Sequence, residues 1–417
     1  MIRILDSSDI GNLLTRRASR MTAAEQTVRP ILDDVRKRGD RALLEYARRF
    51  DHLQARTVAL AQSDLEGAYR RMPADLRASL RVAARNIRAY AKLQLPQPRK
   101  MAAGPGLRIS QIVRPLDCVA AYIPGGRYPL PSTLLMTAIP AQVAGVRRIV
   151  AACPRPADAV LGTAAFLKLS SLFQMGGAHA IAAFAYGTKT VPRADRIVGP
   201  GNIYVAAAKK LLAGEVGIDF VAGPTEILII ASAEASAGDA RWIAADMLAQ
   251  AEHDTDASAV LLTTSRRLAL AVAGVIERQL LTLPTADVAR QAIDRNSAIV
   301  LVGSVDEAVE LSNRFAPEHL SIPDAKLLPA IRHAGSVFIG PYSPEAAGDY
   351  ASGPNHVLPT SGVARIRGGL SAADFVKVIS VQQLSRQALR RLTPAITTLA
   401  RAEGLEAHAR SVEARNQ

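Results

Sequence analysis

Short apolar runs that alternate with helical stretches limit most strongly what this chain can fold into. The runs are rich in Val, Ile, Leu and Ala, which is typical of strands buried on both faces. Because parallel neighbours need a crossover connection, usually a helix, the alternation predicts βαβ units and an α/β fold. The expected strands are 119–123, 148–152, 196–198 and 226–231, alternating with helices at 131–144, 158–170, 177–185 and 202–213, and further strands follow at 258–262, 298–302 and 336–339.

The two ends of the chain are expected to be helical. Thr22 and Glu25 stand at the spacing of a capping box, and an amphipathic pattern continues from them to residue 49. A second helix is expected over 75–93. From about residue 371 the sequence is helical in pattern and Arg-rich, which we interpret as a small dimerisation tail. With 417 residues, the chain is long enough for two or three domains.

The charge balance indicates a generally basic surface. Lys and Arg number 51 against 37 Asp and Glu, which gives a net charge of +14. These cations are spread along the chain and do not alternate with exposed aromatics, so nucleic acid is not an expected partner. No membrane partner is expected either, because the most apolar region, 118–146, is interrupted by an arginine, prolines and glycines.

Cysteine usage points to a cytoplasmic protein. Cys118 and Cys153 are the only two cysteines, which is too few for a disulfide framework and fits a reducing compartment. Residues 1–20 carry acidic and basic side chains without a long apolar core, so we expect no signal peptide. A metal would have to be held by nitrogen and oxygen ligands, since no zinc-type cysteine pair exists.

Two glycine-rich turns stand between an expected strand and an expected helix. They are Ile123-Pro124-Gly125-Gly126 and Gly199-Pro200-Gly201-Asn202, and neither is the G-x-G-x-x-G fingerprint of dinucleotide binding. Ligands of open α/β sheets bind at such places, because helix N-termini and free backbone N–H groups point into the crevice. An ordinary tight turn explains each motif equally well.

Two residue pairs have side chains suited to chemistry. Gln250 and His253 lie three apart on an expected helix, so both could reach one ion, although a lone helical His is more often structural. Glu318 and His319 are adjacent after Pro317, and a carboxylate with an imidazole could divide two proton transfers between them. The alternative is a surface Glu beside a partly buried His.

The densest polar segment is the loop 348–360. It carries Asp349 and His356 among Gly and Pro, a mixture common in functional loops, although a capped turn also explains the Asp. Near the C-terminus, His408 stands with Glu403 on a helical stretch. A carboxylate, imidazoles and an amide oxygen suit zinc without sulfur, although a Gln ligand is uncommon.

Taken together, these motifs resemble the histidinol dehydrogenase family over nearly the whole chain. Their order and spacing make the resemblance specific, because similarity of fold alone does not produce all of them. The matching stretches are 122–126 (Tyr-Ile-Pro-Gly-Gly), 199–202 (Gly-Pro-Gly-Asn), 222–226 (Ala-Gly-Pro-Thr-Glu), 250–253 (Gln-Ala-Glu-His), 317–320 (Pro-Glu-His-Leu) and 348–360.

The resemblance implies an NAD-linked, four-electron oxidation of L-histidinol through L-histidinaldehyde to L-histidine, the final steps of histidine biosynthesis. It also implies a homodimer with one zinc ion per subunit and an active site shared between subunits. His319 would take the proton of the hydroxyl, and Glu318 would activate the water that attacks the aldehyde. The implied roles are zinc ligands for Gln250, His253, Asp349 and His408, acid–base chemistry for Glu318 and His319, substrate contacts for these six and for Thr225, His356 and Glu403, and NAD contacts for Tyr122, His179 and Asn202.

The same resemblance implies two incomplete Rossmann-like α/β domains with small helical terminal pieces. The expected divisions are 1–20 as an N-terminal segment, 21–121 with 227–370 as a discontinuous first domain, 122–226 as the NAD-binding domain and 371–417 as the dimerisation tail.

A few positions depart from the family pattern. His179 stands where the family usually has a Gln that touches the cofactor, and Thr225 stands where it usually has Ser. The stretch 117–121 is more divergent, and 365–369 carries an extra Arg. None of these changes removes an implied catalytic or zinc position.

Two other functions compete with histidinol oxidation. One is a paralogous zinc- and NAD-dependent dehydrogenase acting on another small alcohol, such as a sulfonated diol. Retention of His356, Glu403 and His408 favours histidinol. The other is a binding or regulatory protein that has lost catalysis, which would have had no need to keep Glu318 and His319 intact.

Overall fold

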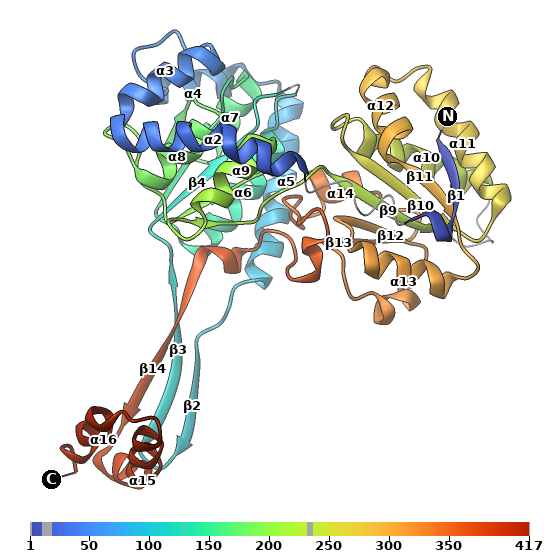
Figure 1. Ribbon diagram of the computed structural model, residues 1–417. Helices are drawn as coiled ribbons and strands as arrows, with labels where there is room; N and C mark the ends of the chain where they lie inside the picture. Colours follow the sequence, from blue (N-terminus) through green and yellow to red (C-terminus); the bar gives the residue numbers. More distant parts are fainter. Residues whose placement is uncertain (1, 11–18, 127, 232–236, 417) are drawn as a thin grey trace.

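The chain forms two α/β bodies and a slender tail (Figure 1). The computed structural model describes residues 2–10, 19–126, 128–231 and 237–416. The N-terminus lies beside the edge of one body, and the C-terminus lies at the far end of the tail. Within the described ranges, no helix has the length and apolar composition needed to cross a membrane.

A five-stranded parallel sheet organises the first body. Its strand order is β6-β5-β4-β7-β8. Side chains of β4 alternate between two apolar cores: Val119 and Ala121 lie in one, Ala120 and Tyr122 in the other, so both faces of the sheet are buried. The strands are β4 (Cys118–Tyr122), β5 (Arg148–Ala152), β6 (Ser171–Phe173), β7 (Arg196–Val198) and β8 (Gly217–Ile218), connected by α6 (Pro131–Ala144), α7 (Asp158–Phe166), α8 (Gly177–Tyr186) and α9 (Ile203–Leu212).

A six-stranded parallel sheet organises the second body, in the order β1-β11-β10-β9-β12-β13. The N-terminal strand β1 pairs in parallel with β11, where Ile4 lies opposite Ile299. The strands are β1 (Arg3–Asp6), β9 (Glu226–Ala231), β10 (Ser258–Thr263), β11 (Ala298–Leu301), β12 (His319–Ile322) and β13 (Ser336–Ile339), with α10 (Ala237–Ala251), α11 (Arg266–Leu280), α12 (Ala286–Asn296), α13 (Val305–Phe315) and α14 (Glu345–Tyr350) around them. Short 3-10 turns occur at Ser7–Ile10, Ala325–Ala330, Val363–Arg365 and Ala372–Phe375.

The tail is a three-stranded antiparallel sheet that ends in two helices. Strand β3 (Leu107–Pro115) lies between β14 (Val376–Leu384) and β2 (Arg99–Gly104), and α15 (Arg386–Ala402) and α16 (Glu406–Glu413) follow. Figure 1 shows the tail extending well away from both bodies.

The expected strands and the α/β class are confirmed, but the expectation that the chain is wholly helical from 371 is wrong. Residues 376–384 form β14, which pairs along its whole length with β3. That pairing joins segments more than 260 residues apart, so no local pattern reveals it.

The N-terminal helices also differ from expectation. The single helix expected over 22–49 is two helices, α2 (Ser19–Arg38) and α3 (Asp40–Asp51), because Gly39 between them adopts a left-handed φ of 56°. Thr22 lies inside α2, so it is not a helix cap.

The packing of 21–121 differs from the expected domain division. Helices α2, α3, α4 (Gln62–Arg71) and α5 (Ala74–Leu93) contribute to the two apolar cores of the five-stranded body, whereas the expected division grouped them with 227–370. The N-terminal strand β1 belongs to the six-stranded sheet and is not a separate segment. Helical periodicity shows which face of a helix is buried but not which sheet covers it.

Candidate functional site

A cleft of about 2030 Å³ lies between the two bodies. From the five-stranded body it is lined by residues that follow the carboxyl ends of the strands, such as Pro124, Pro154 and Pro200. From the six-stranded body it is lined by residues at the amino ends of the strands, such as Thr225 and Glu318. The carboxyl edge of one parallel sheet therefore faces the amino edge of the other.

The structure brings nine of the predicted site residues together along this cleft. Two glycine-rich turns and the N-termini of α6, α8 and α9 lie on the same side of it. The nine are Tyr122, His179, Asn202, Thr225, His253, Glu318, His319, Asp349 and His356.

The turn before α9 is fixed from several directions. Gly199 has a left-handed φ of 111°, and a side chain there would collide with the carbonyl oxygen of Tyr122. Its N–H donates to the Asp219 carboxylate at 2.8 Å, and its carbonyl accepts from Lys209 Nζ at 2.9 Å. Asn202 caps α9, since its Oδ1 accepts from the N–H groups of residues 204 and 205. Lys209 and Asp219 form a buried ion pair behind this turn.

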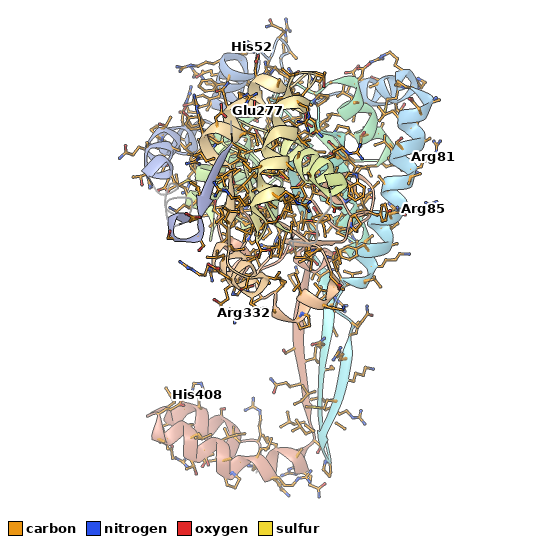
Figure 2. The ribbon with its side chains drawn as sticks, turned by 90° about the vertical axis from the view of Figure 1, so that its right-hand side faces the viewer. His52, Arg81, Arg85, Glu277, Arg332 and His408 are labelled. Carbon is orange, nitrogen blue, oxygen red and sulfur yellow. The ribbon has the colours of Figure 1, made fainter. Side chains whose placement is uncertain are left out.

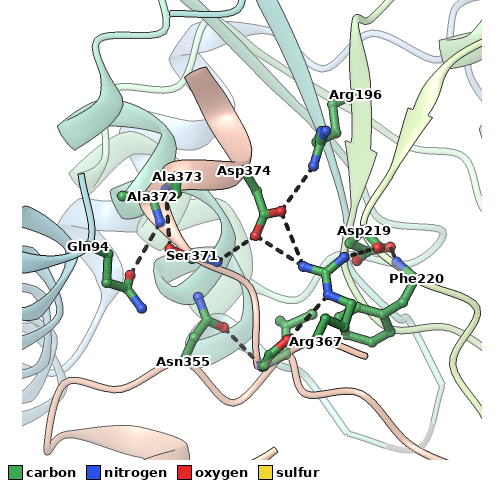
Figure 3. Close-up of polar contacts among 12 residues, drawn as sticks. Gln94, Arg196, Asp219, Phe220, Asn355, Arg367, Ser371, Ala372, Ala373 and Asp374 are labelled. Carbon is green, nitrogen blue, oxygen red and sulfur yellow. Dashed lines mark hydrogen bonds and ion pairs between the residues drawn. The ribbon is translucent and has the colours of Figure 1, made fainter. Parts of the chain in front are cut away.

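The extra arginine of 365–369 ties that turn to the start of the tail (Figure 3). The Arg367 guanidinium bonds the Asp374 carboxylate at 3.1 Å and contacts the carbonyl oxygen of Asp219. It also lies 5.1 Å from the centre of the Phe220 ring, and Arg196 shares the Asp374 carboxylate at 3.2 Å. This departure from the family pattern is therefore a structural clamp next to the cleft.

On the other side of the cleft, Glu318 is a buried carboxyl group. Its Oε2 accepts from the Thr225 hydroxyl at 2.7 Å and from the Glu226 N–H at 2.8 Å. Burial raises the pKa of Glu318 to about 7, and these two hydrogen bonds oppose the rise. A carboxyl group with such a pKa can accept or donate a proton near neutral pH.

His319 lies beside it, with the two ring nitrogens in different surroundings. Nδ1 lies 3.2 Å from the Glu226 carbonyl oxygen, and Nε2 lies 3.5 Å from Asp349 Oδ1. Among the described residues, Nε2 is a buried atom without a hydrogen-bond partner. Burial lowers the pKa of His319, but the surrounding carboxylates, Glu318 foremost, outweigh it and raise that pKa to about 10. The unsatisfied Nε2 marks a place where a ligand would bond.

The predicted metal ligands are brought together only in part. His253 lies two residues beyond the end of α10, not on the helix with Gln250 as expected. Its Nδ1 is 2.9 Å from the carbonyl oxygen of Ala249, which leaves Nε2 as the free ligand atom. Asp349 lines the cleft. Burial raises the pKa of Asp349, but the contact with His319 outweighs burial, so the pKa of Asp349 is lowered.

Gln250 is fully buried and does not line the cleft. The hydrogen-bond network places its amide nitrogen 2.9 Å from Glu345 Oε2 and its oxygen 3.0 Å from the Glu226 N–H. Within the described chain, no group of three or more His, Cys, Asp or Glu is arranged to hold a metal. His253 and Asp349 are the only predicted ligands of those types near the cleft.

Comparison with known proteins decides the family. The histidinol dehydrogenase family profile matches residues 14–416. The chain is 45% identical over 413 residues to histidinol dehydrogenase from Geobacter metallireducens, covering 97% of this chain and 94% of that protein. It is 47% identical over 397 residues to the enzyme from Methanothermobacter thermautotrophicus, covering 93% and 92%. This chain belongs to the histidinol dehydrogenase family.

A solved structure supports the assignment. The crystal structure of histidinol dehydrogenase from Elizabethkingia anophelis matches with a TM-score of 0.94 at 34% identity, covering 99% of this chain and 98% of that chain. The match includes the tail, because nearly the whole chain is covered. Membership of the histidinol dehydrogenase family favours histidinol over another small alcohol as the substrate.

The two remaining predicted residues lie far from the cleft. Glu403 ends α15 and His408 lies in α16, and both are exposed. Figure 2 shows His408 at the end of the tail, well separated from both bodies. Within a single copy of the chain, Glu403 and His408 therefore do not reach the cleft.

Three residues next to the cleft had not been expected there. Thr133 in α6 lies 3.3 Å from His356 Nε2, and its place in the first turn after a glycine-rich loop was the one available signal. Glu345 is buried against the Gln250 amide, and Asp51 pairs with His179. Their sequence surroundings give no sign of either contact, because the partners are distant in the chain.

Proposed function

We propose that this protein oxidises L-histidinol to L-histidine through L-histidinaldehyde, using NAD. The observation that carries the proposal is the buried Glu318–His319 pair, which lines the cleft and whose His319 Nε2 atom has no hydrogen-bond partner among the described residues. This pair lies across the cleft from the glycine-rich turns and helix N-termini, which suit the phosphates of a dinucleotide. NAD, when bound, supplies the hydride acceptor for both oxidation steps.

We assign the two proton transfers to different members of the pair. His319 Nε2 is the atom that faces the bound hydroxyl and takes its proton. Glu318, held by Thr225 and the Glu226 N–H, activates the water that adds to the aldehyde. His356 is fixed by the Asp349 carbonyl at 2.8 Å and by Thr133, and it lines the substrate part of the cleft with Thr225.

Because the pKa of His319 is about 10, its imidazole carries a second proton at neutral pH when the cleft holds no ligand. Because acidic neighbours hold that proton, it leaves more easily once positive charge enters the cleft. The substrate brings such charge with its ammonium group. Zinc, when bound, would supply a dication that offsets the Asp349 charge and orients the substrate nitrogens.

The side chains present fit such a zinc site as far as one chain extends. His253 and Asp349 line the cleft, with His253 Nε2 left over from the Ala249 contact and Asp349 Oδ1 3.5 Å from His319 Nε2. Gln250 is buried three residues before His253. We propose that these three and His408 of the partner subunit hold the ion, with Glu403 of the partner subunit contacting substrate.

A homodimer is proposed on the evidence of the tail. Val378, Ile379 and Val381 on β14 and Leu399 on α15 are exposed, Leu399 to 64%. The three-stranded sheet and two helices of the tail leave these side chains uncovered in a single copy. Exposed apolar side chains gathered on one segment are typical of a protein–protein interface. A second copy that covers the tail would also carry His408 toward the cleft of its neighbour.

The protein is proposed to act in the cytoplasm. Cys118 and Cys153 are buried free thiols, as expected in a reducing compartment.

The experiment is NADH formation by purified protein with L-histidinol, with and without a zinc chelator. About two NADH per histidinol, lost on chelation and restored by zinc, would support the four-electron reaction. No turnover by zinc-loaded, folded dimer would contradict it.

A further inference from the structure

A buried hydrogen bond between Asp51 and His179 in the cofactor half of the cleft is not used by the chemistry described above. Asp51 ends α3 and His179 lies in the first turn of α8. Asp51 Oδ2 is 2.8 Å from His179 Nε2, and the two side chains are 6% and 2% exposed. Both residues line the cleft.

The same carboxylate oxygen also fixes the turn that leads into α8. Asp51 Oδ2 accepts from the Gly176 N–H at 2.8 Å. The next N–H, of Gly177, donates to the Tyr122 hydroxyl at 3.1 Å. Asp51 therefore fixes both the orientation of the His179 ring and the position of the backbone turn from which α8 begins.

The ring of His179 has little freedom to turn. Tyr46 and Phe50 lie beside it, with ring centres 5.9 and 6.1 Å away. With Nε2 facing a carboxylate, the proton of the neutral ring stays on Nε2, and Nδ1 keeps its lone pair. No described residue hydrogen-bonds Nδ1, which lies on the side of the ring next to Gly177 in the cleft wall.

We propose that Asp51 is a positioning residue of the cofactor site, which holds His179 so that Nδ1 presents a hydrogen-bond acceptor to a hydroxyl or carboxamide N–H group of NAD. The inference rests on the proposed function, because it assigns NAD to this half of the cleft. A glutamine at position 179 could offer either a donor or an acceptor. The histidine held by Asp51 offers an acceptor only.

The test compares Asp51→Ala, Asp51→Asn and His179→Ala in NAD binding, measured by calorimetry without histidinol. Asp51→Ala and His179→Ala should each weaken binding about three- to tenfold, the effect of one hydrogen bond. Asp51→Asn should bind within about twofold of the parent, because one amide oxygen can accept both hydrogen bonds that Oδ2 accepts. The KM for histidinol should stay unchanged in all three.

Two further comparisons separate positioning from a general structural role. Asp195 also accepts two backbone N–H groups in the five-stranded body but does not line the cleft, so Asp195→Ala is the matched control for lost stability. It should lower the melting temperature without changing NAD affinity. The double variant Asp51→Ala/His179→Ala should bind NAD no more weakly than His179→Ala alone, because the Gly177 hydrogen bond to Tyr122 still holds the backbone turn and Asp51 then reaches NAD only through the His179 ring.

The tautomer provides a readout that needs no variant at position 51. In the ¹⁵N spectrum of the histidine rings, the signals removed by His179→Gln should be those of a ring protonated at Nε2. A ring protonated at Nδ1, additive losses in the double variant, or unchanged NAD affinity in folded Asp51→Ala would each overturn the inference. Parent protein that binds no NAD would overturn the proposed function itself.

Discussion

Replacing Glu318 with Gln gives the sharpest separation of the two oxidation steps. The amide keeps an oxygen for the Thr225 hydroxyl and the Glu226 N–H, so the local hydrogen bonds survive. It cannot accept a proton, and loss of a general base slows a step by about 10²- to 10⁴-fold. That corresponds to about 3–5 kcal/mol of barrier for the water-dependent step alone.

The assay supplies L-histidinol and L-histidinaldehyde in separate stopped-flow experiments with NAD. Oxidation of the aldehyde should fall by the full factor, and oxidation of the alcohol should fall by less than about tenfold. Glu310→Gln, an exposed carboxyl group on α13, is the matched control and should change neither step. Equal losses in both steps, or an aldehyde step within about threefold of the parent, would refute the division of roles between Glu318 and His319.

Four other outcomes are expected. Aldehyde oxidation should rise with pH through about 7, because the raised pKa of Glu318 keeps it protonated below that value, and a flat pH–rate profile would contradict this. Lys209→Met should lower the free energy of unfolding by about 3–5 kcal/mol in denaturant titrations, since it leaves the buried Asp219 carboxylate without its cation. Lys210→Met, which breaks an exposed pair with Glu25, is the control and should lower it by less than about 1 kcal/mol. His253→Ala should lose zinc by elemental analysis while keeping its circular dichroism, and full zinc content would exclude His253 as a ligand. Ile379→Glu should shift sedimentation from dimer to monomer, and an unchanged dimer would place the interface elsewhere.

The local pattern of the sequence determined the strands and most of the helices. Runs such as 149–152 and 227–231 are apolar throughout because both faces of a parallel strand are covered, and this property is visible without a structure. The Gly199 turn and the adjacent Glu318 and His319 were also recognisable, because their chemistry resides in neighbouring residues.

Tertiary structure alone decided which distant segments meet. Asp51 reaches His179, and β14 reaches β3, across separations that no periodic pattern records. The raised pKa of Glu318 likewise comes from its burial in the folded chain, not from its neighbours in sequence. The sequence determined which side chains the chain offers, and the packing of the two sheets decided which of them share a cleft, because contacts between distant segments depend on how whole elements cover one another's apolar faces.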